Sequence, residues 1–285
     1  MMRAKLFPLS VPRRLALLAG LMLLGTGCAI VSPPSPPPSG AHRPFDPHFT
    51  DLNYLLAHYV TPQGVDYAGL KTEQGRLEIA LYQMLDVNQE QFQNWTRDSQ
   101  LAFLINAFNA HALERVLRAW PVGSLSDTGH FGYAMRERNI RLLGREWSLN
   151  MLLDELMSLP YHDARAIFLV NWCAKDCAPL PPAAVNSMNL GDMLERQTRL
   201  VMADAHYYQY NSEKHIAYVS RLLGWYRDAF ERDYGTLWGF LKKYLSPADV
   251  QKIALRPTGP RIRFLKFDDN LNASAPARPK APAEK

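Results

Sequence analysis

Two cysteines, four residues apart in the second half of the chain, carry the side chains with the greatest chemical potential. Cys173 and Cys177 stand in the segment Asn-Trp-Cys-Ala-Lys-Asp-Cys-Ala-Pro. Two nearby thiols can close a disulfide in an oxidising compartment, lie buried and inert, or leave one thiol free to react. The sequence leaves all three states open. A zinc site needs four ligands, and no second Cys/His pair has suitable spacing, so we expect neither a metal nor a cofactor.

A nucleophilic Cys177 would need a base that lowers the pKa of its thiol. His162 is the nearest candidate in sequence, and the neighbouring Asp163 would orient its imidazole. His111 is a second candidate. The alternative is that Cys177 is buried or paired with Cys173, and that both histidines are solvated or capping groups. We favour this structural alternative.

Two asparagines, Asn106 and Asn109, lie three residues apart and therefore share one face of a predicted helix. Asparagine is a poor helix former, and its amide is costly to bury without hydrogen-bond partners. The two amides would either line a cleft near Cys177 and bind a substrate carbonyl, or hold the backbone of a buried loop within residues 171–180. We favour the structural role.

One arginine and one aromatic group complete the candidates. Arg165 is a candidate for ligand binding or for an internal ion pair with Asp163 or Asp154. Aromatic side chains at helical spacing near the end of the chain are expected to form core rather than a platform for sugars. They are Trp225, Tyr226, Phe230, Tyr234 and Trp238.

The first 27 residues have the pattern of a lipoprotein signal peptide. Basic residues occupy the start, an apolar run covers 15–24, and small residues at 25–27 precede Cys28. This run is too short to span a bilayer, which takes about 20 apolar residues. The junction resembles a bacterial lipobox, although Gly25 stands where leucine is usual, and implies that Cys28 is acylated. Ala29 in the next position resembles an outer-membrane sorting signal.

The composition of the remaining chain argues against nucleic acid as a partner. The net charge is +5, but four of the 32 basic residues lie in the signal, which leaves 28 basic against 27 acidic residues. No block of like charge stands out, so we expect no nucleic-acid binding. Residues 28–44 form a lipidated cysteine and a proline-rich tether, and 273–285 read as a disordered tail.

Hydrophobic periodicity predicts a helix-rich α+β fold with a small, mostly antiparallel sheet, in a single domain over 45–272. The strongest helix runs from Asp98 to Trp120 and stops at Pro121. Further helices are predicted from Asp46-Pro47 to residue 59 and at 75–85, 189–202 and 247–255. Short strands are predicted at 139–143, 166–170, 215–219 and 261–267.

Several phrases in this order resemble the domain-of-unknown-function family 547 of bacteria and plants. They lie at 65–67, 102–110, 120–124, 147–149, 163–165, 177–180, 224–230 and 267–272. The resemblance covers 65–272. In the family, a cysteine with two histidines and a glutamate nearby resembles the equipment of a papain-like cysteine hydrolase, so the resemblance by itself implies thiol chemistry.

This chain departs from the family pattern where that chemistry would reside. Leu153-Asp154 stands where members usually have Glu-His, and Ile167 stands where they usually have histidine. Trp172 occupies the position of the first family cysteine, with Cys173 shifted by one. The second cysteine is kept as Cys177 without the two histidines that would activate it.

Together, these features predict an envelope lipoprotein that acts as a binding or scaffold module and is catalytically degenerate. The alternative is a cysteine-dependent hydrolase or acyl transferase acting on envelope peptide or amide bonds. The expected partner is the membrane, reached through the lipid anchor at the periplasmic face of the outer membrane. The sequence names no ligand.

Overall fold

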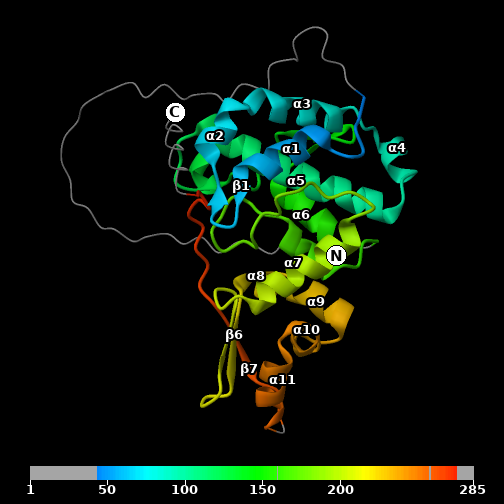
Figure 1. Cartoon of the computed structure of the whole chain (residues 1–285). Coiled ribbons are helices and arrows are strands. Elements are labelled where there is room, and N and C mark those ends of the chain that lie inside the picture. Colours follow the sequence, from blue (N-terminus) through cyan, green and yellow to red (C-terminus); the bar gives the residue numbers. More distant parts are fainter. Residues whose placement is uncertain (1–43, 159, 257, 275–285) are drawn as a thin grey trace, which may run out of the picture. The chain divides into compact units, whose positions relative to one another are not determined.

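The computed structural model describes residues 44–158, 160–256 and 258–274, and these residues form a helix-rich α+β fold (Figure 1). The signal peptide, Cys28 and most of the tether lie outside the described residues, as does the tail from residue 275. In the described part, no helix is both long and apolar enough to cross a membrane. The α-helices are α1 (Thr50–Tyr59), α2 (Tyr67–Thr72), α3 (Gln74–Leu85), α4 (Gln89–Gln93), α5 (Arg97–Ala119), α6 (Leu149–Met157), α7 (Leu190–Ala203), α8 (Arg221–Trp225), α9 (Arg227–Tyr234), α10 (Leu237–Tyr244) and α11 (Pro247–Ala254).

Helix α5 is the central buried element, as the periodicity predicts. Thr96 caps its first turn by accepting a hydrogen bond from the backbone N–H of Ser99. Fifteen of its residues are buried, because α2, α3, α6 and the 3-10 helix η1 (Leu125–Thr128) pack around it. A helix that is enclosed on most sides can present polar side chains only to internal partners, which is the setting of Asn106 and Asn109.

The strands form three small separate sheets. Strands β1 (Val60–Thr61) and β2 (Gly64–Val65) make one antiparallel pair, and β3 (Ile140–Leu142) and β4 (Arg145–Trp147) make another. The third sheet has the order β5-β6-β7, with β5 antiparallel and β7 parallel to the middle strand. Its bounds are β5 (Tyr208–Asn211), β6 (Ile216–Val219) and β7 (Arg261–Phe264). Most strand pairs are thus antiparallel, as predicted.

Two predicted elements differ in the structure. Residues 166–170 form no strand and belong largely to the 3-10 helix η3 (Ala164–Leu169), which Asp163 caps by accepting from the N–H of Arg165. A short, wholly buried apolar run has the same composition in either conformation, so the pattern cannot separate them. Helix α1 begins at Thr50 rather than at Pro47, because Phe49 takes a left-handed conformation with φ 52°.

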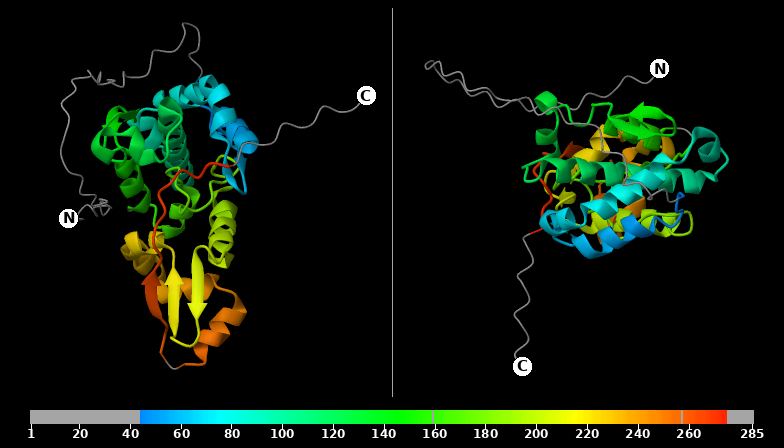
Figure 2. Two further views of the ribbon diagram at one scale, coloured as in Figure 1. Left: turned by 90° about the vertical axis from the view of Figure 1, so that its left-hand side faces the viewer. Right: turned by 90° about the horizontal axis from the view of Figure 1, so that it is seen from above.

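The last described residues, 268–274, run as an extended segment back across the helical part of the fold (Figure 2). The N–H of Asn272 donates to the carbonyl of Cys173 at 3.0 Å, and its carbonyl accepts from the N–H of Val65 at 2.9 Å. Gly64 permits this approach, since a Cβ there would overlap with the carbonyl oxygen of Asn272. The segment thereby links β2 to the cysteine loop.

The predicted aromatic group lies in α8, α9 and α10. Phe230 is fully buried and packs against Phe168 and Phe240, with ring centroids 5.8 and 4.6 Å away. Tyr234 contacts Phe240 edge-on, and Trp225 lies against Phe267. These contacts make the group part of the core, as expected from its spacing.

Candidate functional site

The buried amides of α5 hold two separate loop segments. Asn106 donates from Nδ2 to the carbonyl of Val185 at 2.6 Å and accepts from the N–H of the same residue at 3.0 Å. Asn109 donates to the carbonyl of Leu169 at 2.8 Å and accepts from the N–H of Asn171 at 3.0 Å. Each amide satisfies two backbone groups in the core, but only Asn109 reaches the predicted segment 171–180, through Asn171, whereas Asn106 holds Val185 outside it.

Asn171 continues this network into the cysteine loop, residues 171–180. Its Nδ2 donates to the carbonyl of Ala178 at 2.8 Å, and its Oδ1 accepts from the N–H of Ala174 at 3.2 Å. The same Oδ1 accepts from Nδ2 of Asn272, whose own Oδ1 accepts from the hydroxyl of Tyr67 at 2.6 Å. The loop is therefore fixed by side chains from α5, α2 and the final extended segment.

Both thiols of this loop are free and buried, so the disulfide, one of the three states left open by the sequence, is not formed. The side chains have different surroundings: Cys173 lies beside the Tyr67 hydroxyl, whereas Cys177 lies near the backbone amides of Trp172 and Ala174. Burial raises the pKa of Cys173 to about 12, although Tyr67 acts in the opposite direction. Burial also raises the pKa of Cys177 well above its usual range. A thiol in such surroundings stays protonated at neutral pH.

Neither histidine proposed as a base accompanies Cys177. His162 is exposed and takes a left-handed backbone conformation with φ 48°. His111 lies on α5, where burial followed by Arg118 and Arg115 lowers its pKa to about 3. The groups that shift the pKa of Cys177 are burial, backbone amides, Cys173 and Asp176, and none of them is an imidazole. The pair of Cys177 and His162 is therefore not assembled.

Arg165 forms the internal ion pair expected of it, with Asp163 rather than Asp154. Its Nε and Nη2 donate to the two carboxylate oxygens of Asp163 at 2.9 and 2.8 Å, and its Nη1 donates to Glu195 at 3.1 Å. Tyr244 also donates its hydroxyl to Glu195. With its donors directed at these partners, Arg165 ties η3 to α7 and α10 and is not presented to a ligand.

The structure also joins two side chains that the sequence does not connect. His206 lies 2.6 Å from Asp176 through Nε2, and the other oxygen of Asp176 accepts from the N–H of Asp268. Next to His206, the Tyr207 hydroxyl donates to the carbonyl of Cys177. Half of the His206 side chain is exposed, whereas the Cys177 thiol is in the core. The imidazole is thus half exposed while Asp176 is largely buried, and His206 is not among the groups that shift the pKa of Cys177.

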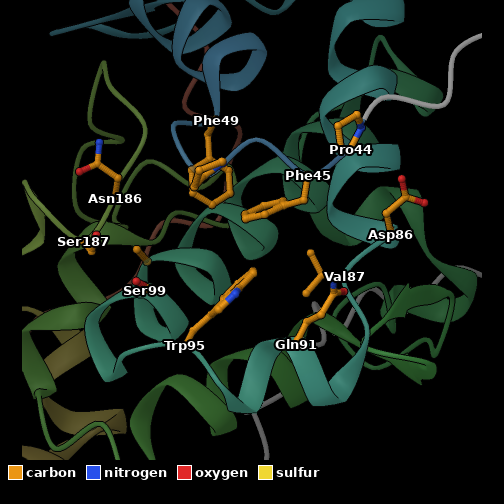
Figure 3. A pocket seen from close by; sticks show the side chains of 12 residues that line it. Pro44, Phe45, Phe49, Asp86, Val87, Gln91, Trp95, Ser99, Asn186 and Ser187 are labelled. Atoms are coloured by element: carbon orange, nitrogen blue, oxygen red, sulfur yellow. The ribbon is translucent and has the colours of Figure 1, made fainter.

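A cavity of about 620 Å³ lies elsewhere, between the N-terminal end of the described chain and the start of α5 (Figure 3). Phe45 stacks on Trp95 with ring centroids 5.0 Å apart and meets Phe49 edge-on at 5.4 Å. In Figure 3 the rings of Phe45 and Trp95 point toward one another inside it, with Val87 below. A cavity of this volume with a mainly apolar and aromatic lining is typical of pockets that bind small molecules or peptides.

The polar part of the cavity is sparse and carries little charge. Asn186 and Ser187 lie on the side opposite Asp86 (Figure 3), and Gln91 lies below. Among the described lining residues, Asp86 is the one ionisable group. A negatively charged ligand would therefore find no cation among these described lining residues, whereas a neutral apolar ligand fits them.

The loop that closes this cavity is held by the amide network. Asn106 binds both backbone groups of Val185, directly before Asn186 and Ser187. Asn189 supports the same turn, donating to the carbonyl of Ala184 at 3.0 Å. The cavity wall is thus fixed by a side chain of α5.

The described residues contain no group of three or more His, Cys, Asp or Glu side chains placed to hold a metal ion.

Comparison with known proteins gives a family without a known activity. Residues 92–200 match the model of the family described as a protein of unknown function, DUF547, which agrees with the resemblance seen in the sequence. No curated protein matches the chain, and no solved structure matches it. The matched region contains α5, both buried thiols and the amides that hold their loop. Over residues 92–200, therefore, the chain is similar to the DUF547 family.

Proposed function

We propose that this protein is a lipid-anchored envelope protein that binds an apolar ligand in the aromatic cavity and does not use Cys177 as a nucleophile. The observation that carries the proposal is the open cavity of about 620 Å³ walled by Phe45, Phe49 and Trp95. Its lining favours a neutral ligand with an aromatic or aliphatic body. A small molecule and a short peptide segment both meet this description.

The state of the thiol supports a binding function over catalysis. Cys177 is 1% exposed, and burial raises its pKa, whereas a nucleophilic cysteine needs its pKa lowered by an imidazole or another cation. The family resemblance implies two histidines nearby, and this chain has Asp154 and Ile167 at those positions. Burial raises the pKa of Asp154, and Asp154 is not among the groups that shift the pKa of Cys177.

A thiol hydrolase or acyl transferase is the alternative, and one observation favours it. The pair of His206 and Asp176 adjoins Cys177 in sequence and space, through Asp176 itself and the hydrogen bond from Tyr207. For catalysis the cysteine loop would have to open and bring the thiol to His206. The buried hydrogen bonds of Asn171 oppose that opening.

The anchor rests on the sequence features of residues 1–44. A basic start, an apolar run, small residues before Cys28 and a proline-rich stretch up to Pro44 support acylation and export. Pro44 and Phe45 line the cavity, so the binding site begins where the tether ends.

Fluorescence titration with N-phenyl-1-naphthylamine, a neutral aromatic probe, tests the cavity. Ser187 is exposed on the rim, so Ser187→Trp fills the opening without disturbing the core. We expect saturable binding to the native protein and an affinity at least about tenfold lower in Ser187→Trp, a loss of about 1.4 kcal/mol.

Two further variants make the titration decisive. Ser212→Trp introduces the same side chain at an exposed site between β5 and β6 and should bind the probe as the native protein does. Cys177→Ala should also bind normally. If Ser187→Trp and Ser212→Trp bind the probe equally well, while circular dichroism shows both folded, the cavity is not the binding site.

A further inference from the structure

Basic residues are distributed unevenly between two parts of the fold, although the overall composition is nearly balanced in charge. Residues 44–203 contain 13 Lys and Arg against 18 Asp and Glu, whereas residues 204–267 contain 11 against 6. The near-neutral total therefore combines an acidic helical part with a basic part that includes the sheet β5-β6-β7. A charge count over the whole chain cannot show this separation.

One face of that sheet is uniformly free of acidic side chains. In the strand register, Asn211, Ile216 and Arg261 form one row, and Gln209, Tyr218 and Arg263 form the next. Side chains alternate between faces, so both rows point to the same side. Both arginines are exposed, whereas Ala217 and Val219 on the other face are completely buried. The left view of Figure 2 faces these strands.

Two more basic residues stand at the end of the paired strands. Arg221 follows β6 and Lys266 follows β7, and both line a small hollow that also contains His206 and Asp176. Asp176 is already occupied by His206 and by the N–H of Asp268. By the same alternation Arg221 and Lys266 have the parity of the opposite face, so we call Arg261 and Arg263 the basic sheet face and treat Arg221 and Lys266 as cations that flank it.

Neither arginine of the basic sheet face, and neither flanking cation, forms a side-chain ion pair or hydrogen bond with any other described residue. By contrast, Arg227, Arg232 and Lys252 in the same part of the chain pair with acidic neighbours. Exposed charges on β7 also keep an edge strand from pairing with another chain. That role accounts for Arg261 and Arg263 but not for Arg221 and Lys266, which lie beyond the strand.

We infer that the basic sheet face binds the anionic headgroups of a membrane surface. Two exposed cations on one sheet face beside the amphipathic ring of Tyr218, with two further cations at the end of the strands, match an extended negatively charged surface better than a small ligand. The proline-rich segment before residue 44 follows an export signal, which favours a lipid surface over nucleic acid. This inference does not depend on the aromatic cavity.

Vesicle co-sedimentation tests it. The full chain is purified with Cys28→Ser, so that no attached lipid contributes, and is mixed with vesicles of phosphatidylcholine alone or with phosphatidylglycerol. We expect binding to the anionic vesicles that weakens with added salt. The double variant Arg261→Gln/Arg263→Gln should bind them about 30-fold more weakly, since each basic residue near an anionic surface contributes a factor of about five.

A matched variant separates a local face from net charge. Lys242→Gln/Lys252→Gln removes the same charge from exposed positions on α10 and α11 and should bind as the Cys28→Ser protein does. Equal losses in both double variants would overturn the inference, as would equal binding to the two kinds of vesicle. Tighter binding to a DNA duplex than to anionic vesicles at the same salt would assign the face to a different polyanion and overturn it as well.

Discussion

Replacing Asn106 by leucine should destabilise the fold and weaken the cavity together. Leucine keeps the size of the side chain but removes both hydrogen bonds to Val185, which is buried in the core. An unsatisfied buried backbone group costs about 1–3 kcal/mol, and the loop can relax in part, so we expect a total loss of about 2–4 kcal/mol in the free energy of unfolding.

Urea unfolding followed by far-ultraviolet circular dichroism measures this loss. In a domain of this size, about 3 kcal/mol corresponds to a fall of about 6–12 °C in Tm. Asn139→Leu is the matched control, because it makes the same change at an exposed side chain and should alter stability by less than about 0.5 kcal/mol. Because Val185 precedes the cavity residues Asn186 and Ser187, the folded Asn106→Leu protein should also bind N-phenyl-1-naphthylamine more weakly.

The outcome that refutes this reasoning is specific. If Asn106→Leu unfolds within about 0.5 kcal/mol of the native protein, the two hydrogen bonds do not hold the loop. If it is destabilised but binds the probe normally, the loop is held for stability alone and does not shape the cavity.

Three further changes test other parts of the structure. Burial, and then neighbouring arginines, lower the pKa of His111 to about 3, so the unfolded chain takes up its proton first and stability falls as pH drops from about 6.5. In urea unfolding, the stability lost between about pH 7 and pH 4 should be about 1–2 kcal/mol smaller in His111→Gln than in the native protein. This difference is smaller than the pKa shift alone would give, because the His111 side chain is partly exposed. Arg165→Met, which leaves Asp163 and Glu195 without their shared cation, should cost about 1–3 kcal/mol in the same assay, and an unchanged midpoint would contradict the ion-pair account. Cys28→Ser should move the protein from the membrane pellet to the soluble fraction after cell breakage, and its retention in the pellet would contradict lipid anchoring.

The helices could be predicted from the sequence where a long hydrophobic periodicity ends at a clear helix-terminating residue. Helix α5 follows its predicted bounds within a residue at each end, since Thr96 caps it and Pro121 follows it. The buried amides were also predictable, because polar groups enclosed in such a helix need internal partners. η3 was not, because a six-residue segment with five buried residues carries no period long enough to distinguish a strand from a 3-10 turn.

The two surfaces proposed for binding depend on distant parts of the chain. The cavity combines Phe45, Trp95 and Ser187, which have no local pattern in common. The basic sheet face arises from strand register, which sets Arg261 and Arg263 on one side and leaves the acids elsewhere. Composition alone therefore does not show whether charged residues cluster on the folded surface.

The pair of His206 and Asp176 shows the same limit at the candidate thiol. Thirty residues separate the two side chains, and only the return of the chain before β5 brings them together. Sequence proximity instead favoured His162, which the structure leaves exposed. Distance along the chain is a poor guide to a catalytic base, because catalytic partners meet through tertiary folding.

Alkylation of the folded protein by iodoacetamide tests the central claim, that Cys177 is a closed structural thiol, most directly. Intact mass and peptide mapping are read after exposure at about pH 8, with and without urea, using the Cys28→Ser protein so that only Cys173 and Cys177 can react. The structure predicts no adduct on Cys177 in the native state and full alkylation of both thiols in urea, because burial keeps them protonated and inaccessible. Rapid native alkylation of Cys177 that is lost in His206→Ala would contradict the account and establish the thiol as an activated nucleophile.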